Sequence, residues 1–326
     1  MSYTYYVKTS DDDSKDGKSE ANAFKTITKA VQSVAAGDTV YIAPGTYREG
    51  ISLITSGSSG NNITFEGDPE CNHFSNEKQG YVRITKCDSN EQPSSNATVF
   101  NFNSKNYNIL RNVCIDGIKS GPTMASGVSL SNNDICENCI VQSLYYGILG
   151  SSKESGGIVR NCLSIGSYYA YAQLQLVENS IGIGGCSGFV SCNEVKNCIG
   201  SGSYNSMVAI HGGFYDSNVY NSLGKGYYGF NNCNCYNCIS FASHIGVRGG
   251  SSNTLNHHIS INCAISFQGI AYNNLLNVDG QKYVYCYTPI GANITGTPVE
   301  CKHIGFVGDV ITMIKKIASS LRFNLF

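Results

Sequence analysis

The pentapeptide VRNCL at residues 159–163 is one copy of a phrase that returns along the middle of the chain. Close copies are CENCI (136–140), VENSI (177–181), VKNCI (195–199), VYNSL (219–223) and CYNCI (235–239), and looser ones are LRNVC (110–114) and SINCA (260–264). The gaps between successive Asn residues are 26, 23, 18, 18, 24, 16 and 25 residues, about 21 on average. Fixed phrases separated by loops of variable length are typical of a solenoid, so the sequence predicts an all-β solenoid with one coil per repeat.

Each position of the phrase predicts a place in the coil. The residue two before the Asn is small and mostly apolar, which predicts an internal stack about 4.8 Å from coil to coil. The Asn fits a sharp bend with a left-handed backbone. The residue between them predicts an outward column, and its first five members alternate in charge and favour an ion-pair ladder. Those five members are Arg111, Glu137, Arg160, Glu178 and Lys196.

The N-terminal part predicts a strand over residues 3–8, a helix over about 23–35 that Gly37 stops, and then strand, turn and strand. The stretch AFKTITKAVQSVAAGDTVYIAPGTYREG, residues 23–50, resembles the N-terminal segment of right-handed parallel β-helix proteins of the pectate-lyase-like superfamily. The resemblance implies that the helix caps the open end of the solenoid. We therefore expect a β-helix with its cap over 1–280, and a connector with an amphipathic segment over 281–326.

Composition narrows the class of protein. The chain has 326 residues, 14% charged, with a net charge of -1, so nothing steers it to nucleic acid or anionic lipid. The sequence contains no stretch of about 18 apolar residues, so no transmembrane helix is expected. The 15 cysteines are odd in number, most occupy a repeat position, and the first residues do not resemble a signal peptide, so we expect reduced, buried thiols.

Metal and cofactor sites are not expected. Cys136–Cys139 and Cys233–Cys235–Cys238 have metal-like spacing, but the repeat accounts for four of them and the two groups lie about four coils apart. The acidic run at residues 11–13 lacks the alternation of a calcium loop and predicts a solvated loop. The pair His257–His258 is expected to be exposed.

Carboxylates are too few for a glycoside hydrolase, which needs a converging pair. Between residues 141 and 280 the acids are Glu154, Glu178, Glu194, Asp216 and Asp279. The segment KGYYGF, residues 225–230, resembles a stretch of the calcium-dependent lyases of the superfamily, where an Asp usually precedes Gly-Phe. Tyr228 stands before Gly229 here, which argues against that metal site.

One constellation remains for chemistry. His211, Asn231 and Arg248 are expected to form an outward column, with His244, Lys225 and Tyr215 nearby. A metal-free lyase could use Arg248, or a Tyr–His pair, as base and acid. A sugar-binding face is the favoured interpretation, because tyrosines offer stacking surfaces. These tyrosines are Tyr145, Tyr146, Tyr168, Tyr169, Tyr171, Tyr204, Tyr227 and Tyr228.

The C-terminal segment predicts an amphipathic helix that caps the solenoid or docks on another subunit or a larger assembly. Its apolar residues are Val310, Ile314, Ile317, Leu321, Phe323 and Phe326. Low charge, few carboxylates and this tail favour a non-catalytic structural protein, such as a capsid decoration protein, spike or fibre of a virion, forming a homo-oligomer or part of the particle surface. The alternative is a polysaccharide lyase or related carbohydrate-active enzyme, implied by the family resemblance.

Overall fold

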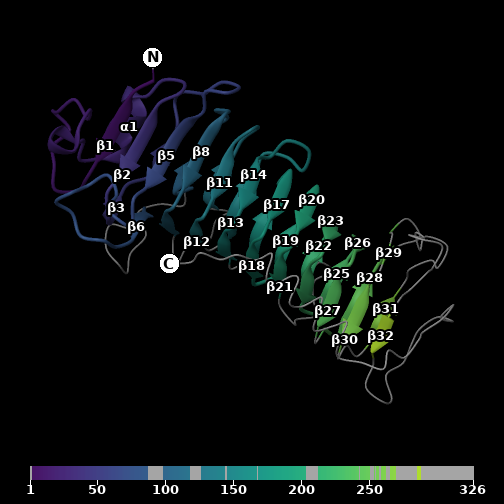
Figure 1. Cartoon of the computed structure of the whole chain (residues 1–326). Helices are drawn as coiled ribbons and strands as arrows, with labels where there is room; N and C mark the ends of the chain where they lie inside the picture. The colour runs from purple at the N-terminus through teal and green to yellow at the C-terminus, as the bar shows by residue number, and fades with distance from the viewer. Residues whose placement is uncertain are drawn as a thin grey trace. The chain divides into compact units, whose positions relative to one another are not determined.

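The structure is a computed structural model that describes residues 2–86, 98–117, 126–143, 145–166, 168–202, 212–241, 243–249, 253, 255–256, 258–261, 265–268 and 285–287. The predicted C-terminal helix, His211, Tyr204 and His257 lie outside these residues. The chain divides into two compact units, residues 1–165 and 166–326. In both, short strands wind through three sheets with parallel pairing throughout, which is the predicted right-handed parallel β-helix (Figure 1). No helix among the described residues is long and apolar enough to cross a membrane.

From β2 onward, the first unit builds each sheet from every third strand, as winding requires. One sheet contains β1 (Thr4–Val7), β2 (Thr39–Ile42), β5 (Ile63–Gly67), β8 (Asn108–Arg111), β11 (Ile135–Glu137) and β14 (Ile158–Arg160). The second contains β3 (Gly45–Arg48), β6 (Val82–Thr85), β9 (Cys114–Asp116), β12 (Ile140–Ser143) and β15 (Leu163–Gly166). The third contains β4 (Ile51–Ser52), β7 (Phe100–Asn101), β10 (Ser126–Leu130) and β13 (Tyr146–Gly150).

The second unit repeats this plan. One sheet contains β17 (Leu176–Glu178), β20 (Glu194–Lys196), β23 (Asn218–Tyr220), β26 (Asn234–Tyr236) and β29 (Leu255–Asn256). The second contains β18 (Ile181–Gly184), β21 (Ile199–Ser201), β24 (Leu223–Lys225), β27 (Ile239–Phe241), β30 (Ile259–Ile261) and β32 (Tyr285–Tyr287). The third contains β16 (Tyr169–Ala172), β19 (Ser187–Val190), β22 (Gly212–Tyr215), β25 (Tyr228–Asn231), β28 (Ile245–Arg248) and β31 (Ile265–Gln268).

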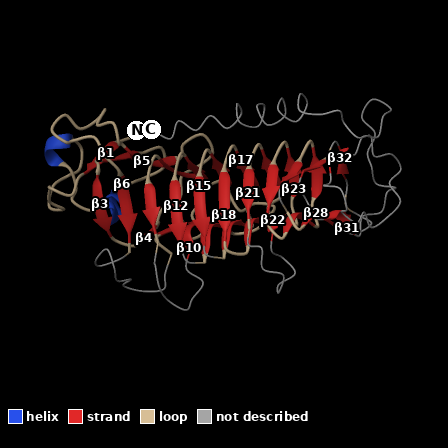
Figure 2. Ribbon diagram, turned by 90° about the horizontal axis from the view of Figure 1, so that it is seen from below, coloured by secondary structure: helices blue, strands red, loops and turns tan. Residues whose placement is uncertain are grey.

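Helix is confined to the N-terminal segment of the described residues (Figure 2). A 3-10 turn, η1, covers Glu20–Asn22, and α1 covers Ile27–Ser33. The helix starts later than predicted because Thr26 is its N-cap, with Oγ1 accepting from the N–H of Lys29 at 3.1 Å, and because Phe24 pairs with Val7 in a β-bridge. The helix packs against β1, the terminal strand of its sheet, as the predicted cap should.

The repeated Asn occupies a left-handed corner, as predicted. Asn residues 112, 138, 161, 179, 197, 221 and 237 have φ between 48° and 59°. Their amides also hydrogen-bond from coil to coil in the second unit: Asn197 donates to Asn179 at 3.1 Å, Asn221 to Asn197 at 3.3 Å and Asn237 to Asn221 at 3.2 Å. Asn satisfies two demands at once, because it tolerates the left-handed backbone and pairs along the stack.

The Asn221→Ala variant is expected to lose about 2 kcal/mol of unfolding free energy, from the left-handed backbone penalty and from two amide hydrogen bonds. Asn221→Gly should recover the backbone part, since glycine adopts positive φ without strain. Denaturant unfolding of the three proteins measures both parts. Equal midpoints for the Ala and Gly variants would contradict the backbone explanation.

Where the residue after the corner Asn is Ser or Cys, its side chain faces the interior in the described coils and donates a hydrogen bond. Oγ of Ser180 and of Ser222 donates to the carbonyl two residues earlier at 2.7 Å, and Sγ of Cys198 does so at 3.1 Å. Cys and Ser alternate here because both are small and carry a donor. The seven residues two before the Asn from Leu110 to Cys235 are fully buried, which confirms the predicted stack over these coils.

The predicted outward column forms in part as an ion-pair ladder. In the first unit, Nη2 of Arg111 lies 2.6 Å from Glu66 and Nη1 lies 3.5 Å from Glu137. In the second, Lys196 lies 2.6 Å from Glu194 on its own strand, and the column continues as Tyr220 and Tyr236 with rings stacked 4.8 Å apart. The residues of these pairs are half-buried and remain in contact with solvent, so each pair contributes modestly to stability.

Aromatic rings and glycines form the core of the second unit. The rings of Tyr171, Phe189, Phe214 and Phe230 stack with centroids 4.8, 4.8 and 4.9 Å apart. Opposite them, Gly182, Gly200 and Gly224 share one register position on β18, β21 and β24. Tyr171 is therefore a core residue and not the predicted sugar-stacking surface, because its position repeats the Phe of later coils.

Candidate functional site

The second unit presents a continuous run of aromatic and basic side chains around β25 and β28. The ring of His244 stacks on Tyr227 with centroids 4.8 Å apart, and Tyr227 meets Tyr228 edge-on at 4.8 Å. Nη1 of Arg248 donates to Oη of Tyr228 at 2.8 Å, and the guanidinium lies 5.1 Å from that ring's centroid. Lys225 is exposed at the end of β24, two residues before Tyr227. We call these five residues, Lys225, Tyr227, Tyr228, His244 and Arg248, the tyrosine–arginine face.

A tight turn positions this face. Gly226, between β24 and β25, has φ 149°, and a Cβ there would lie 3.1 Å from Cα of Gly212. Glycine at this bend lets the chain pass close to the neighbouring coil, so that Tyr227 and Tyr228 leave the turn as a pair. Tyr228 is mostly buried, whereas His244 is exposed and Arg248 half-buried, so the charged groups remain accessible.

The predicted column is present in part. Tyr215, Asn231 and Arg248 are in register on β22, β25 and β28. Asn231 is buried and Tyr215 half-buried. From the candidate catalytic residues, the structure thus connects His244 and Arg248 through the two tyrosines, and Lys225 precedes Tyr227 by two residues.

Two further tyrosine pairs lie at the starts of strands of the third sheet, with the second tyrosine of each as the first strand residue. Tyr145 and Tyr146 meet edge-on at 4.6 Å in the first unit, and Tyr168 and Tyr169 at 4.4 Å in the second. Tyr169 shares its register position with Ser187, Gly212 and then Tyr228. The two tyrosine pairs of the second unit are therefore three coils apart, about 14 Å along the stack, with small residues between them.

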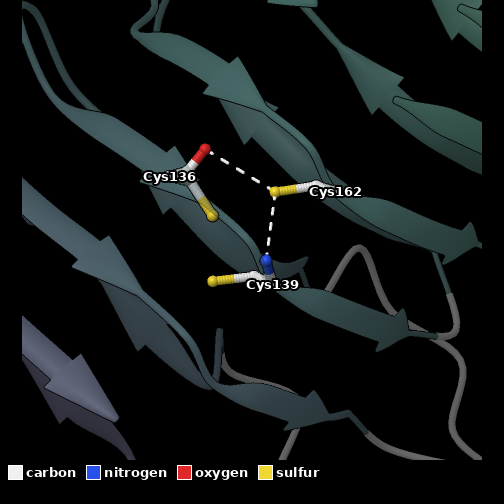
Figure 3. A group of neighbouring side chains, drawn as sticks. All are labelled: Cys136, Cys139 and Cys162. Carbon is white, nitrogen blue, oxygen red and sulfur yellow. Dashed lines mark hydrogen bonds between the residues drawn. The ribbon is translucent and has the colours of Figure 1, made fainter. Parts of the chain in front are cut away.

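A cluster of sulfur atoms in the first unit was not expected. Sγ atoms of Cys136, Cys139 and Cys162 all lie within 4.8 Å of one another, and the three residues are fully buried (Figure 3). The N–H of Cys139 donates to Sγ of Cys162 at 3.4 Å. Sequence spacing linked only Cys136 and Cys139; Cys162 belongs to the next coil. The signal was the shared slot after the Asn, which puts Cys139 and Cys162 one strand spacing apart.

The surroundings of the three thiols shift their pKa values in different directions. Hydrogen bonds with Cys139 and Cys162, and then burial, raise the pKa of Cys136 well above its usual value. Burial first, and then contact with Cys162, raises the pKa of Cys139. Burial also opposes ionisation of Cys162, but the hydrogen bonds that its sulfur accepts from Cys136 and Cys139 lower the pKa of Cys162 well below its usual value. The shift of Cys162 differs in direction because its sulfur accepts the hydrogen bonds of the other two thiols.

The family follows from a match to residues 9–214, more than half of the chain, by the family model described as "Protein of unknown function (DUF1565)". The chain belongs to the DUF1565 family. No curated protein matches this DUF1565 member.

Solved structures share its fold at low sequence identity. A pectate lyase, Pel9A, matches with TM-score 0.59 and 17% identity over 87% of this chain and 82% of its own. A rhamnogalacturonan lyase matches with TM-score 0.53 and 16% identity over 90% and 87%. A GH136 lacto-N-biosidase from Eubacterium ramulus matches with TM-score 0.56 and 12% identity over 81% of this chain and 61% of its own. These likenesses establish the β-helix for this DUF1565 member.

The acids described in the second unit of this DUF1565 member are used in its framework. Glu194 pairs with Lys196, and Asp216 accepts from Oγ of Ser191 and Nδ2 of Asn232, both at 3.3 Å, at a corner of the coil. Glu178 lies in the outward column, in register with Lys196. Among the described residues of this unit, the tyrosine–arginine face therefore has no carboxylate pair, and its basic groups favour anions.

Proposed function

We propose that the chain is a glycan-binding β-helix protein that holds an acidic polysaccharide on the tyrosine–arginine face. The observation that carries the proposal is the run His244–Tyr227–Tyr228–Arg248, in which each side chain contacts the next. Rigid strands on both sides fix this run in advance of binding, which lowers the entropic cost of ordering it.

The chemistry of the face suits a uronic-acid polymer. A guanidinium can bind a carboxylate through two parallel hydrogen bonds, and Arg248 uses Nη1 toward Tyr228 while its other N–H groups can serve a ligand. Tyr227 and His244 add flat apolar rings for the sugar, with a polar edge for its hydroxyls. Repetition of the tyrosine pair at Tyr168–Tyr169 suits a ligand that extends along the coils.

The named substrates of similar structures agree with this ligand class. Two of the matching structures are called pectate lyase and rhamnogalacturonan lyase, and both names denote polymers that contain galacturonic acid. Their sequence identity to this chain is too low to transfer activity, so they support the ligand class and the fold only.

The Arg248→Ala variant is expected to bind polygalacturonate at least tenfold more weakly than wild type, about 1.4 kcal/mol, because the ligand carboxylate loses its guanidinium. Lys196→Ala is the matched control: it removes one positive charge from the same unit but from another sheet, and should bind as wild type does. Calorimetric titration at two salt concentrations, with neutral dextran as second ligand, measures this. Equal affinities for Arg248→Ala and Lys196→Ala would refute the site.

Catalysis by β-elimination is the enzymatic alternative, since Arg248 and the Tyr228 hydroxyl are paired as an acid and base could be. Ultraviolet absorbance of unsaturated products from acidic polysaccharides, with and without Ca²⁺, separates a lyase from a binder. Product that disappears in Arg248→Ala would make the face an active site.

A place on a virion or other particle surface is compatible with glycan binding. The C-terminal segment proposed to dock on such a particle is outside the described residues. The virion proposal therefore depends on the sequence pattern of residues 310–326. Deletion of residues 304–326 tests it: unchanged assembly or particle attachment would remove its main support.

A further inference from the structure

The three-thiol cluster of Cys136, Cys139 and Cys162 provides a set of metal ligands that the glycan-binding proposal does not use. In the part of the chain that the structure describes, these three side chains form a group whose possible metal-ligand atoms all lie within 4.8 Å of one another. Each member is fully buried, and the three come from two consecutive coils. Soft sulfur ligands select soft ions such as Cu(I), whereas Mg²⁺ and Ca²⁺ prefer oxygen.

The sulfur spacing is close to that of a three-coordinate site. With metal–sulfur bonds of about 2.3 Å, three sulfurs in a trigonal plane lie about 4.0 Å apart. The present separations of at most 4.8 Å would close if each sulfur moved inward by about half an ångström. Rotation about a single side-chain bond achieves movement of this size, so the backbone corners at Asn138 and Asn161 need not change.

Burial decides the charge of the ion. A divalent ion held by three thiolates leaves one net negative charge in the interior, and a neutral site with a divalent ion requires two buried thiols to lose their protons. A monovalent ion that replaces one thiol proton leaves the site neutral. We propose that the three-thiol cluster binds one soft monovalent ion, Cu(I), through the Cys162 thiolate and the lone pairs of the Cys136 and Cys139 sulfurs.

The step balances without any redox change. The Cys162 S–H bond breaks, its proton leaves for solvent, and a sulfur–copper bond forms with copper in the +1 state throughout. Cys162 is the member whose Sγ accepts a hydrogen bond from a backbone N–H, that of Cys139 at 3.4 Å, so a negative charge on this sulfur has a donor beside it.

The repeat by itself accounts for the presence of each cysteine as a small buried residue. The test must therefore detect metal binding that needs all three cysteines together. Cys198 supplies the matched control because it occupies the slot of Cys162 in another coil, with Ser180 and Ser222 in that slot before and after it. Serine is native in this slot, where it keeps the hydrogen bond to the backbone carbonyl. Cys162→Ser and Cys198→Ser therefore change the same atom in equivalent surroundings.

The full chain is unfolded, then refolded anaerobically with Cu(I) or with Zn(II), and dialysed against a competing chelator of each ion. We expect wild type and Cys198→Ser to retain equal amounts of Cu(I), one equivalent more than Cys162→Ser, whose affinity at the site should fall at least 100-fold. The retained Cu(I) should raise Tm in the first two proteins only. Zn(II) retention should be the same in all three.

Equal Cu(I) retention by wild type and Cys162→Ser would overturn the site. A difference of one equivalent with Zn(II), and none with Cu(I), would overturn the monovalent assignment. If Cys162→Ser does not refold, judged by far-ultraviolet circular dichroism, Cys139→Ser replaces it. X-ray absorption of copper-loaded wild type then decides independently: three sulfur neighbours support the proposal, and a copper site with nitrogen or oxygen neighbours refutes it.

Discussion

Gly224→Ala is expected to destabilise the second unit by about 3 kcal/mol, near the upper end for insertion of one methyl group into a packed core. A Cβ on Gly224 would lie 2.4 Å from the carbonyl oxygen of Gly229 and 2.9 Å from Cε2 of Phe230. Backbone cannot move aside locally, because every strand of the coil is paired with the coils before and after it.

The whole glycine column obeys the same restriction. A Cβ on Gly182 would lie 2.9 Å from Cε2 of Phe189, and one on Gly200 would lie 2.8 Å from Cε2 of Phe214. The column changes to Ser240 on the next coil, where Val247 replaces the ring and leaves room for a side chain. In these three coils glycine thus faces a phenylalanine ring and leaves the space that the ring occupies.

Denaturant unfolding measures the loss, with Gly80→Ala as control. A Cβ on Gly80 would meet Pro44 at 3.7 Å, which is ordinary contact. The control should unfold within about 0.5 kcal/mol of wild type. Identical midpoints for Gly224→Ala and Gly80→Ala would show that the ring stack does not need the glycine.

Acid should destabilise the second unit through His258, by about 3 kcal/mol between pH 7 and pH 4. His258 is fully buried, contrary to the exposed position expected for the pair His257–His258. Its Nε2 lies 2.7 Å from Oγ of Ser240, and its ring meets Phe230 edge-on at 5.1 Å. Burial lowers the pKa of His258 from 6.5 to about 3.

The sign of this pH effect on stability follows from proton binding by the folded and unfolded chains. Below pH 6.5 the unfolded chain takes up a proton at this imidazole, whereas the folded chain does so only near pH 3. Unfolding is therefore favoured increasingly as pH falls through this window, by up to about 1.4 kcal/mol per pH unit. The stability from neutral His258 is fully present above pH 6.5.

His258→Gln removes the titration and keeps an amide to pair with Ser240. The difference in unfolding free energy between wild type and this variant should change with pH in the stated window. Asp134 titrates with the opposite sign in the first unit, since burial raises its pKa to about 7, but it contributes equally to both proteins. Parallel pH profiles for wild type and His258→Gln would contradict the assignment.

Position in the repeat was readable from the sequence because a solenoid repeats its environment. The phrase around Asn161 predicted a left-handed corner at this Asn, an outward residue just before it, and buried residues two positions before and one position after it. All of these features are present. The helix after residue 23 was predicted in the right place but too long, because the cap at Thr26 and the bridge of Phe24 depend on contacts with other parts of the chain.

Functional residues were predicted less well. Lys225, Tyr227, Tyr228, His244 and Arg248 were all candidates, but the sequence did not show that the last four form a contact series. Tyr171 looked like the other tyrosines and proved to belong to the ring stack. Composition cannot separate these cases, since a tyrosine at the start of a strand and one in its middle differ only in their position along the strand.

The sequence by itself determined the coil: its length, its corners, its buried columns and its parallel winding, because each depends on residues a few positions apart that recur with the repeat. Tertiary structure alone decided which side chains from different coils meet. Variable loops change the sequence separation between neighbours, so Cys162 reaches Cys139 across 23 residues and Arg248 reaches Tyr228 across 20. The distance in space between neighbouring coils is constant, whereas the number of residues between stacked side chains varies. The chemistry of a site depends on the distance in space.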